Sequence, residues 1–101
     1  MIARTWRGWT RLEDAEAYVR YVEDTGGKEY RETPGNRGAW VLWRPDGDRA
    51  EILTFSLWDS RQDIQAFAGD DIEVARFYPE DDRWLVDRER FARHYEVAAP
   101  D

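Results

Sequence analysis

Residues 57–85 read LWDSRQDIQAFAGDDIEVARFYPEDDRWL, and this stretch decides the fold. It opens on the end of an apolar run, after which Ser60 can cap a helix by accepting a hydrogen bond from the amide of Asp63. Apolar residues then recur at helical spacing, which predicts a short helix with one buried face. That inner face is formed by Ile64, Phe67 and Ala68.

This helix is expected to be broken rather than continuous. Gly69 interrupts the pattern, and one further amphipathic turn is expected from Ile72 to Arg76, before Pro79. Residues 80–83 (EDDR) are predicted to be exposed to solvent. A strand end, a broken helix and an aromatic-acidic run, in this order, favour a pocket between a sheet and its helices.

Two strands lead into this stretch and are expected to form a hairpin. Residues 37–44 (RGAWVLWR) and 49–58 (RAEILTFSLW) are rich in β-forming side chains. They flank Pro45-Asp46-Gly47-Asp48, which has the turn chemistry that joins antiparallel strands.

The N-terminal part predicts a strand followed by a helix. Residues 2–9 mix β-forming side chains with arginines. Thr10-Arg11-Leu12-Glu13 matches a capping box, so an amphipathic helix is expected over residues 11–25. Gly26-Gly27 is expected to end it.

A polar loop is expected over residues 28–36 and a last strand over residues 92–97. The complete order is therefore β-α-β-β-α-β over residues 1–101, one domain without a linker or repeat. This order predicts an α+β, ferredoxin-like fold, in which a four-stranded antiparallel sheet carries both helices on one face.

The hairpin strands are apolar on both faces, which predicts a homodimer. Apolar side chains occupy both parities of the two strands: Ala39, Val41 and Trp43 against Trp40 and Leu42, and Leu53, Phe55 and Leu57 against Ile52 and Trp58. In a sheet with one solvent-exposed face, apolar residues alternate with polar residues along each strand. The two predicted helices can cover only one face of this sheet. A symmetric partner sheet is the simplest cover for the other, although a monomer with a few exposed aromatics is an alternative.

Composition excludes several classes of protein. Lys and Arg number 15 against 22 Asp and Glu, and the formal charge of −7 repels a polyanion, so nucleic-acid binding is not expected. The absence of Cys removes disulfides and thiolate chemistry. The start MIARTWRGW lacks the apolar run of a signal peptide, and no stretch is long and apolar enough to span a membrane. A cytoplasmic protein is expected.

Several short motifs resemble the antibiotic biosynthesis monooxygenase-like family. They are Leu57-Trp58-Asp59-Ser60, Phe67 seven positions after Ser60, Asp71-Ile72-Glu73, Tyr78-Pro79-Glu80-Asp81-Asp82 and His94-Tyr95-Glu96-Val97. The resemblance implies a dimeric α/β barrel built from two ferredoxin-like sheets, with an apolar pocket between sheet and helices in each subunit. It also implies cofactor-independent oxygenation of electron-rich aromatic substrates, such as polyketide phenols, or else haem binding with oxidative ring opening.

The residues that the haem-degrading branch of that family uses are missing here. Where the branch has Asn on the first strand, this chain has Thr5 and Trp6. Phe67 replaces its helix Trp, and Ala75-Arg76-Phe77 stands where its His is expected. The sequence therefore argues against haem degradation.

His94 is the candidate catalytic residue. It is the only histidine, and its ordinary pKa lies near neutrality, so it could remove a phenolic proton and produce the anion that reacts with oxygen. The alternative is a strand histidine at the sheet surface or the dimer seam. Strand parity sets His94 and Glu96 against Tyr95 and Val97 but leaves open which pair faces the helices.

A flat aromatic pocket is the candidate substrate site. Its predicted members are Trp6, Trp58, Phe67, Phe77, Tyr78 and Trp84, each of which could equally be ordinary core. Arg76 could neutralise a phenolate or carboxylate of the ligand, or simply pair with Glu73 or Glu80 at the surface.

No metal site is expected. Asp70-Asp71 and Glu80-Asp81-Asp82 lack the spacing of a calcium loop, and a lone histidine cannot build a zinc site. The preferred function is a small oxygenase-like protein that binds or oxidises a planar hydrophobic metabolite without a dedicated cofactor. The alternatives are a non-enzymatic dimeric binding module and a haem-binding protein without degrading activity.

Overall fold

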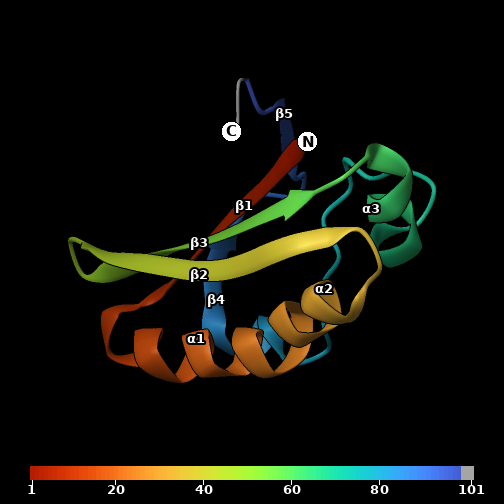
Figure 1. Cartoon of the computed structure of the whole chain (residues 1–101). Coiled ribbons are helices and arrows are strands. Elements are labelled where there is room, and N and C mark those ends of the chain that lie inside the picture. The colour runs from red at the N-terminus through yellow and green to blue at the C-terminus, as the bar shows by residue number, and fades with distance from the viewer. Residues whose placement is uncertain (99–101) are drawn as a thin grey trace.

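The computed structural model, which describes residues 1–98, begins with a ten-residue strand that has neighbours on both sides of the sheet. In chain order the elements are β1 (Ile2–Arg11), the 3₁₀ turn η1 (Leu12–Asp14), α1 (Ala15–Val22), the π-helical turn η2 (Glu23–Gly27), α2 (Lys28–Glu32), β2 (Asn36–Asp46), β3 (Arg49–Trp58), α3 (Arg61–Ala68), α4 (Asp81–Trp84), β4 (Leu85–Arg88) and β5 (Arg93–Glu96). Figure 1 shows the helices α1 and α2 along one side of the strands, and α3 near the end of β3.

The five-stranded sheet is antiparallel, with the order β2-β3-β1-β4. β5 also pairs with β1, over Ile2–Thr5, whereas β4 pairs with it over Gly8–Thr10. Both short strands therefore share one edge of β1. The α+β, ferredoxin-like fold expected from the sequence is confirmed, but the sheet has five strands instead of the predicted four. The strand predicted over residues 92–97 is β5, but nothing in the sequence pattern signals β4 (LVDR), which is short and half charged.

The hairpin is confirmed at its predicted place. β2 and β3 pair along their whole length, from Asn36 opposite Trp58 to Asp46 opposite Arg49. Gly47 has φ +67, in the left-handed region that the tight turn requires and that glycine adopts without strain.

Two groups of buried side chains lie between the sheet and the helices. One joins Ile2 and Trp58 of the sheet to Ile64 and Phe67 of α3. The other is formed by Ala15, Tyr18, Ala50 and Ile52, which join α1 to β3. The predicted inner face of α3 is therefore correct for Ile64 and Phe67, and the hydrogen bond from the Asp63 amide to Ser60 Oγ (3.2 Å) confirms the predicted cap.

The prediction that Gly26-Gly27 ends the first helix was wrong. The chain stays helical through the π turn η2, where Gly27 is buried, and continues into α2 as far as Glu32. Glycine is permissive rather than obligatorily left-handed, and a buried position beside the sheet overrides its usual role at helix ends. The expected loop over residues 28–36 is thus mostly helix.

The capping box at Thr10 was also wrong. Thr10 is buried within β1, opposite Ala50 of β3 and Leu85 of β4, and its hydroxyl donates to the carbonyl of Arg11 (2.8 Å). Pairing with strands on both sides extends β1 beyond the predicted end at residue 9.

Residues 72–76 do not form the expected helical turn. The Ala75 amide donates to the Arg90 carbonyl (3.0 Å), and the Ala92 amide donates to the Glu73 carbonyl (2.8 Å). The segment after α3 is therefore held against residues 90–92 by backbone hydrogen bonds, including an isolated bridge between Val74 and Phe91. Sequence periodicity cannot signal such non-local pairing.

The sequence predicted that residues 80–83 are all exposed to solvent. This prediction was wrong for one of them, Asp81. Asp81 begins α4 and is only 4% exposed. Its carboxylate accepts from the Tyr18 hydroxyl (3.0 Å) and from the Tyr78 amide (2.7 Å), which explains why a charged side chain is buried there.

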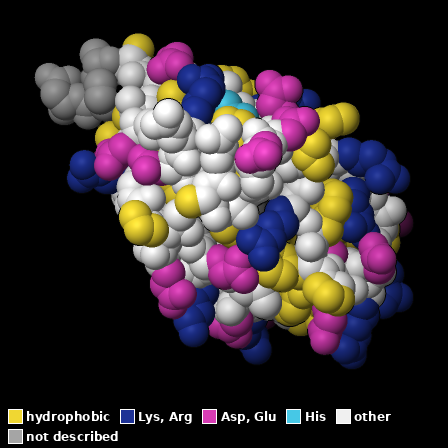
Figure 2. Space-filling model, turned by 90° about the vertical axis from the view of Figure 1, so that its right-hand side faces the viewer, with side chains coloured by type: hydrophobic (Ala, Val, Ile, Leu, Met, Phe, Trp, Pro, Cys, Tyr) yellow, Lys and Arg dark blue, Asp and Glu magenta, His cyan; other side chains and the backbone are white. Residues whose placement is uncertain are grey.

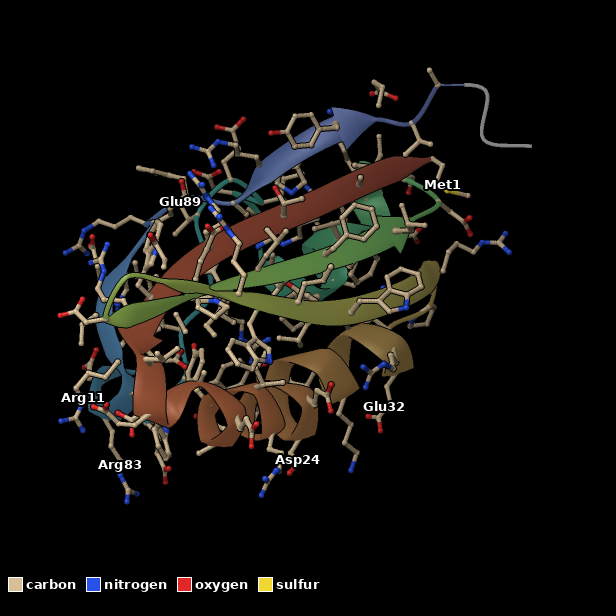
Figure 3. All side chains as sticks on the ribbon, turned by 90° about the vertical axis from the view of Figure 1, so that its left-hand side faces the viewer. Met1, Arg11, Asp24, Glu32, Arg83 and Glu89 are labelled. Carbon is tan, nitrogen blue, oxygen red and sulfur yellow. The ribbon has the colours of Figure 1, made fainter. Side chains whose placement is uncertain are left out.

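The sheet face that points away from the helices, here called the outer face, has no helix over it. Figure 3 looks onto this face, with β5, β1, β3 and β2 crossing the view and α3 behind them. Trp40 and Leu42 of β2 and Tyr95 of β5 lie on it and are about half exposed, at 49%, 48% and 51%. Phe55 packs beside Trp40, with 5.9 Å between ring centroids. The apolar second face deduced from strand parity is therefore present.

Charged side chains of both signs are spread over the surface, with hydrophobic side chains between them (Figure 2). Within residues 1–98, no helix has the length and apolar character needed to cross a membrane.

The cap of α3 gives a direct test of the local structure. Replacing Ser60 by Ala removes the acceptor for the Asp63 amide and should lower the free energy of unfolding by about 1 kcal/mol. Ser60→Thr keeps the hydroxyl and is the matched control. Urea denaturation measures the difference, and equal stability of the two variants would show that the cap contributes nothing.

Candidate functional site

A cavity opens between the inner face of the sheet and the helical layer. Strands β1, β2 and β3 form its floor, α1, η2 and α2 form one wall, and α3 with residues 75–81 forms the other. The empty space between its lining atoms, including the open mouth, is about 620 Å³. The part that the centre of a water-sized sphere can reach is about 60 Å³. That inner space is below the ~150 Å³ of an engineered cavity that holds benzene, so a planar ligand needs side chains at the mouth to move.

Four of the six aromatic residues predicted for the site line this cavity, namely Trp6, Phe67, Phe77 and Tyr78. Trp6 and Phe77 meet edge to face, with ring centroids 6.1 Å apart and an angle of 68° between the rings. Gly8 makes room for the indole of Trp6, because a Cβ at residue 8 would lie 2.5 Å from it. The Trp6 indole is fixed by a hydrogen bond to the Glu89 carbonyl (2.6 Å).

The other two predicted aromatics lie outside the lining. Trp58 is fully buried in the core under α3, donates to Ser56 Oγ (2.8 Å) and packs edge to face on Tyr30. Trp84 is partly buried and packs against the second core group. Tyr30 does line the cavity, but its signal was missed because residues 28–36 read as a polar loop.

Arg76 lies at the mouth of the cavity. Its guanidinium donates to the Phe67 carbonyl (3.0 Å) and pairs with Glu29 of α2 (3.2 Å), rather than with Glu73 or Glu80. It also lies over the rings of Phe67 and Tyr78, 5.0 and 5.4 Å from their centroids. Both members of the ion pair are partly exposed, so the pair bridges the two walls where the cavity meets solvent.

Arg4 is the functional candidate that the sequence reasoning missed. It lies on the inner face of β1, lines the cavity and is only 2% exposed. Its Nε donates to the Tyr30 hydroxyl (3.2 Å), and its Nη1 donates to the Ile72 carbonyl. Strand parity alone could have placed it on the same face as Ile2 and Trp6, but its burial depends on residues far away in the chain.

His94 faces the helical side of the sheet but does not line the cavity. It lies opposite Arg4 in the register of β1 and β5, and Arg4 Nη1 is 2.8 Å from its Nε2. Because arginine only donates hydrogen bonds, Nε2 must be an acceptor and the ring must be neutral. Burial, with the charges of Arg4 and Arg61, lowers the pKa of His94 from 6.5 to about 4. The catalytic role of His94 stays a prediction, and this position gives the residue no direct access to a ligand in the cavity.

Asp81 and two tyrosines form a polar wall of the cavity. Asp81, Tyr18 and Tyr78 all line it, and both carboxylate oxygens of Asp81 already accept hydrogen bonds. Burial and the neighbouring Asp81 raise the pKa of Tyr18. Burial and the nearby carboxylate of Glu29 raise the pKa of Tyr78, whose hydroxyl has no hydrogen-bond partner within residues 1–98.

Neither a metal ion nor haem fits these residues. No group of three or more His, Cys, Asp or Glu side chains that could hold a metal occurs in residues 1–98. The cavity lining contains no His, Cys or Met that could be an axial haem ligand. The raised pKa values of Tyr18 and Tyr78 also disfavour the tyrosinate that would be needed instead.

The arrangement of strands and helices matches solved structures of antibiotic biosynthesis monooxygenase-type proteins. A protein of Nitrosomonas europaea assigned as such a monooxygenase superposes with a TM-score of 0.66 at 17% identity, covering 97% of this chain and 99% of its own. One of Bacillus cereus superposes with a TM-score of 0.68 at 13% identity, covering 99% and 95%. This chain therefore has the antibiotic biosynthesis monooxygenase-like fold, as its motifs suggested.

The haem degrader MhuD of Mycobacterium tuberculosis, solved with two haems in its active site, shares the fold with a TM-score of 0.59 at 16% identity, covering 97% of this chain and 96% of MhuD. No protein-family model matches the sequence, and no curated protein matches it either. At these identities the likeness concerns the fold alone.

The environment of His94 predicts an unusual titration. As the only histidine, it gives a single Hε1 resonance in proton NMR, and the midpoint of its titration should lie near pH 4 instead of 6.5. Since the folded pKa lies below the unfolded one, His94 favours folding above pH 6.5, and this contribution is lost as the pH falls towards 4. His94→Asn should therefore lose less stability than the unchanged protein between pH 7 and 4.5. A midpoint near 6.5 would contradict the described contact with Arg4.

Proposed function

We propose that this protein binds a planar hydrophobic metabolite, aromatic or polyketide-like, in the cavity between sheet and helices. The observation that carries the proposal is the set of aromatic walls, formed by Trp6, Phe67, Phe77 and Tyr78, around a space with an open mouth. Aromatic rings hold planar ligands by stacking and edge-to-face contacts. Arg76 would act at the entrance, where its pair with Glu29 must open to admit the ligand.

The reaction we propose is cofactor-independent oxygenation of a bound phenol by dioxygen. The deprotonated ring supplies electrons directly to oxygen; one oxygen atom enters the ring, and the other leaves as water with two hydrogens from the substrate. The chain's part is to hold the ring, exclude water and favour the anion. His94 does not reach the cavity lining, so the proton would leave to solvent or to a base on the substrate.

Binding without turnover is the second candidate, and one observation favours it. Asp81, which among residues 1–98 is the only carboxylate that lines the cavity, already accepts hydrogen bonds at both oxygens. The cavity thus offers no unoccupied base among residues 1–98, which suits a binding module better than a proton-abstracting enzyme.

We further propose that two copies pair through their outer faces. Trp40, Leu42 and Tyr95 are each about half exposed on one continuous sheet face. Large exposed apolar patches mark interaction sites, and pairing with a second copy would remove this face from water.

A test of binding and turnover uses 1-naphthol as the probe. Oxygenation would consume one O₂ for each 1,4-naphthoquinone formed, measured with an oxygen electrode and by absorbance. Phe77→Ala should weaken naphthol binding about three- to tenfold, the value of an aromatic contact. Phe91→Ala, at a ring that is 62% exposed and outside the cavity, is the matched control.

The outcomes separate the two candidate functions. Binding with oxygen uptake supports oxygenation, whereas binding without uptake leaves only the binding module. If naphthol affinity were equal in Phe77→Ala and the unchanged protein, the cavity would not be the binding site.

The dimer has its own test. Leu42→Glu puts a charge on the outer face, on the edge strand β2, and should convert a particle of twice 12.0 kDa into one of 12.0 kDa in sedimentation equilibrium. Leu12→Glu, at an exposed leucine of η1, should leave the mass unchanged. A monomeric unchanged protein at micromolar concentration would refute the proposed pairing.

A further inference from the structure

Arg4 combines burial with an absence of opposite charge. It is only 2% exposed, yet among residues 1–98 it forms no ion pair with an Asp or Glu. Its hydrogen-bond partners are a tyrosine hydroxyl, a backbone carbonyl and a neutral imidazole. A buried charge is costly unless it is paired, so a neutral set of partners leaves the charge itself uncompensated.

The donors of Arg4 show where an anion would bind. Nε and Nη1 are occupied by Tyr30, Ile72 and His94, whereas Nη2 makes no hydrogen bond within residues 1–98. Nη2 is on the same edge of the planar guanidinium as Nε, and Nε points to Tyr30, which lines the cavity. Because Arg4 itself lines the cavity, Nη2 is the donor group of this residue that remains for a ligand there.

The surroundings hold this guanidinium in place and do not neutralise it. The lowered pKa of His94, to which burial and the charges of Arg4 and Arg61 contribute, keeps the imidazole neutral. The carboxylate of Asp81 belongs to a different part of the lining, where Tyr18 and Tyr78 occupy it. The cavity thus has the positive charge of Arg4 beside Tyr30 and the negative charge of Asp81 beside Tyr18, while Arg76 at the mouth is paired with Glu29.

We infer that the ligand of this cavity carries an anionic oxygen, a carboxylate or an ionised phenol, which binds Nη2 of Arg4 while the ring lies between the aromatic walls. This inference rests on the proposed function, because it assumes an aromatic ligand in the cavity. It goes further by specifying the charge of the ligand and its orientation, with the anionic end towards β1 and away from Asp81. The role that the sequence suggested for Arg76 is thereby assigned to Arg4.

A matched pair of probes tests the charge. 1-Naphthoate and 1-naphthamide have the same ring and nearly the same shape but differ in charge. Isothermal titration calorimetry on the full chain should show naphthoate binding about tenfold or more tightly than naphthamide, the size expected for a charge-assisted hydrogen bond. Arg4→Met should bring this ratio close to one and leave naphthamide binding nearly unchanged. Arg20→Met, at an exposed arginine on α1, is the control and should keep the full ratio.

A second measurement needs only the unchanged protein, in case Arg4→Met does not fold. The phenolate of 4-nitro-1-naphthol is coloured, so an absorbance titration reports the pKa of the bound probe. That pKa should fall by about one unit relative to the free probe. A bound pKa that is unchanged or raised overturns the inference.

The failures are distinguishable. Equal binding of naphthoate and naphthamide would overturn the role of Arg4 and leave the aromatic site standing. A full ratio in a folded Arg4→Met would also overturn it, since the selectivity would then come from another cation. Binding of neither probe would refute the proposed function itself, and the inference with it.

Discussion

The alternation of side chains along β1 is the constraint on which the rest of the structure depends. β1 is hydrogen-bonded to β3 on one side and to β5 and β4 on the other. A one-residue shift in its register would therefore break the hydrogen bonds along both of its edges. Every second side chain of β1 points to the helical side of the sheet. In chain order these residues are Ile2 in the core, the buried cation Arg4, the cavity-lining Trp6, and Gly8, which makes room for the Trp6 indole. Core, cavity and candidate anion site are thus set by one strand.

The parts of the fold that local chemistry controls could be predicted from the sequence. The hairpin follows from a turn that needs a left-handed glycine, and the start of α3 follows from one hydroxyl that reaches one amide. The errors share a different cause, which is contact with distant residues. Thr10 is a residue type that caps helices, but here it pairs with strands on both sides. Gly26-Gly27 is a pair that often ends a helix, but here it packs beside the sheet within a helical turn. Local rules hold only where no tertiary contact competes with them.

The candidate site shows the same division. Strand parity correctly separates His94 from Tyr95, but only the pairing of β5 with β1 decides that His94 faces the helices and Tyr95 the outer face. Counting aromatic residues finds four of the rings that line the cavity, yet it cannot separate a lining ring from a core ring such as Trp58. The charged members are the hardest to foresee, because the burial of Arg4 and Asp81 depends on partners more than sixty positions away. A charged residue in a sequence is by default assigned to the surface.

The π turn at η2 has a consequence for the register of the helical layer. Such a turn holds one more residue than an α-helical turn, so it shifts the phase of everything that follows it by about 100°. Tyr30 of α2 comes directly after this shift and from there meets both Phe67 and the guanidinium of Arg4. Removing one residue from this turn would restore the α-helical phase and rotate Tyr30 about the helix axis, away from these two contacts. The same domain with an uninterrupted α-helix would therefore have a cavity of a different shape. A change of one residue in the length of η2 is thus enough to alter which ligands the cavity can hold.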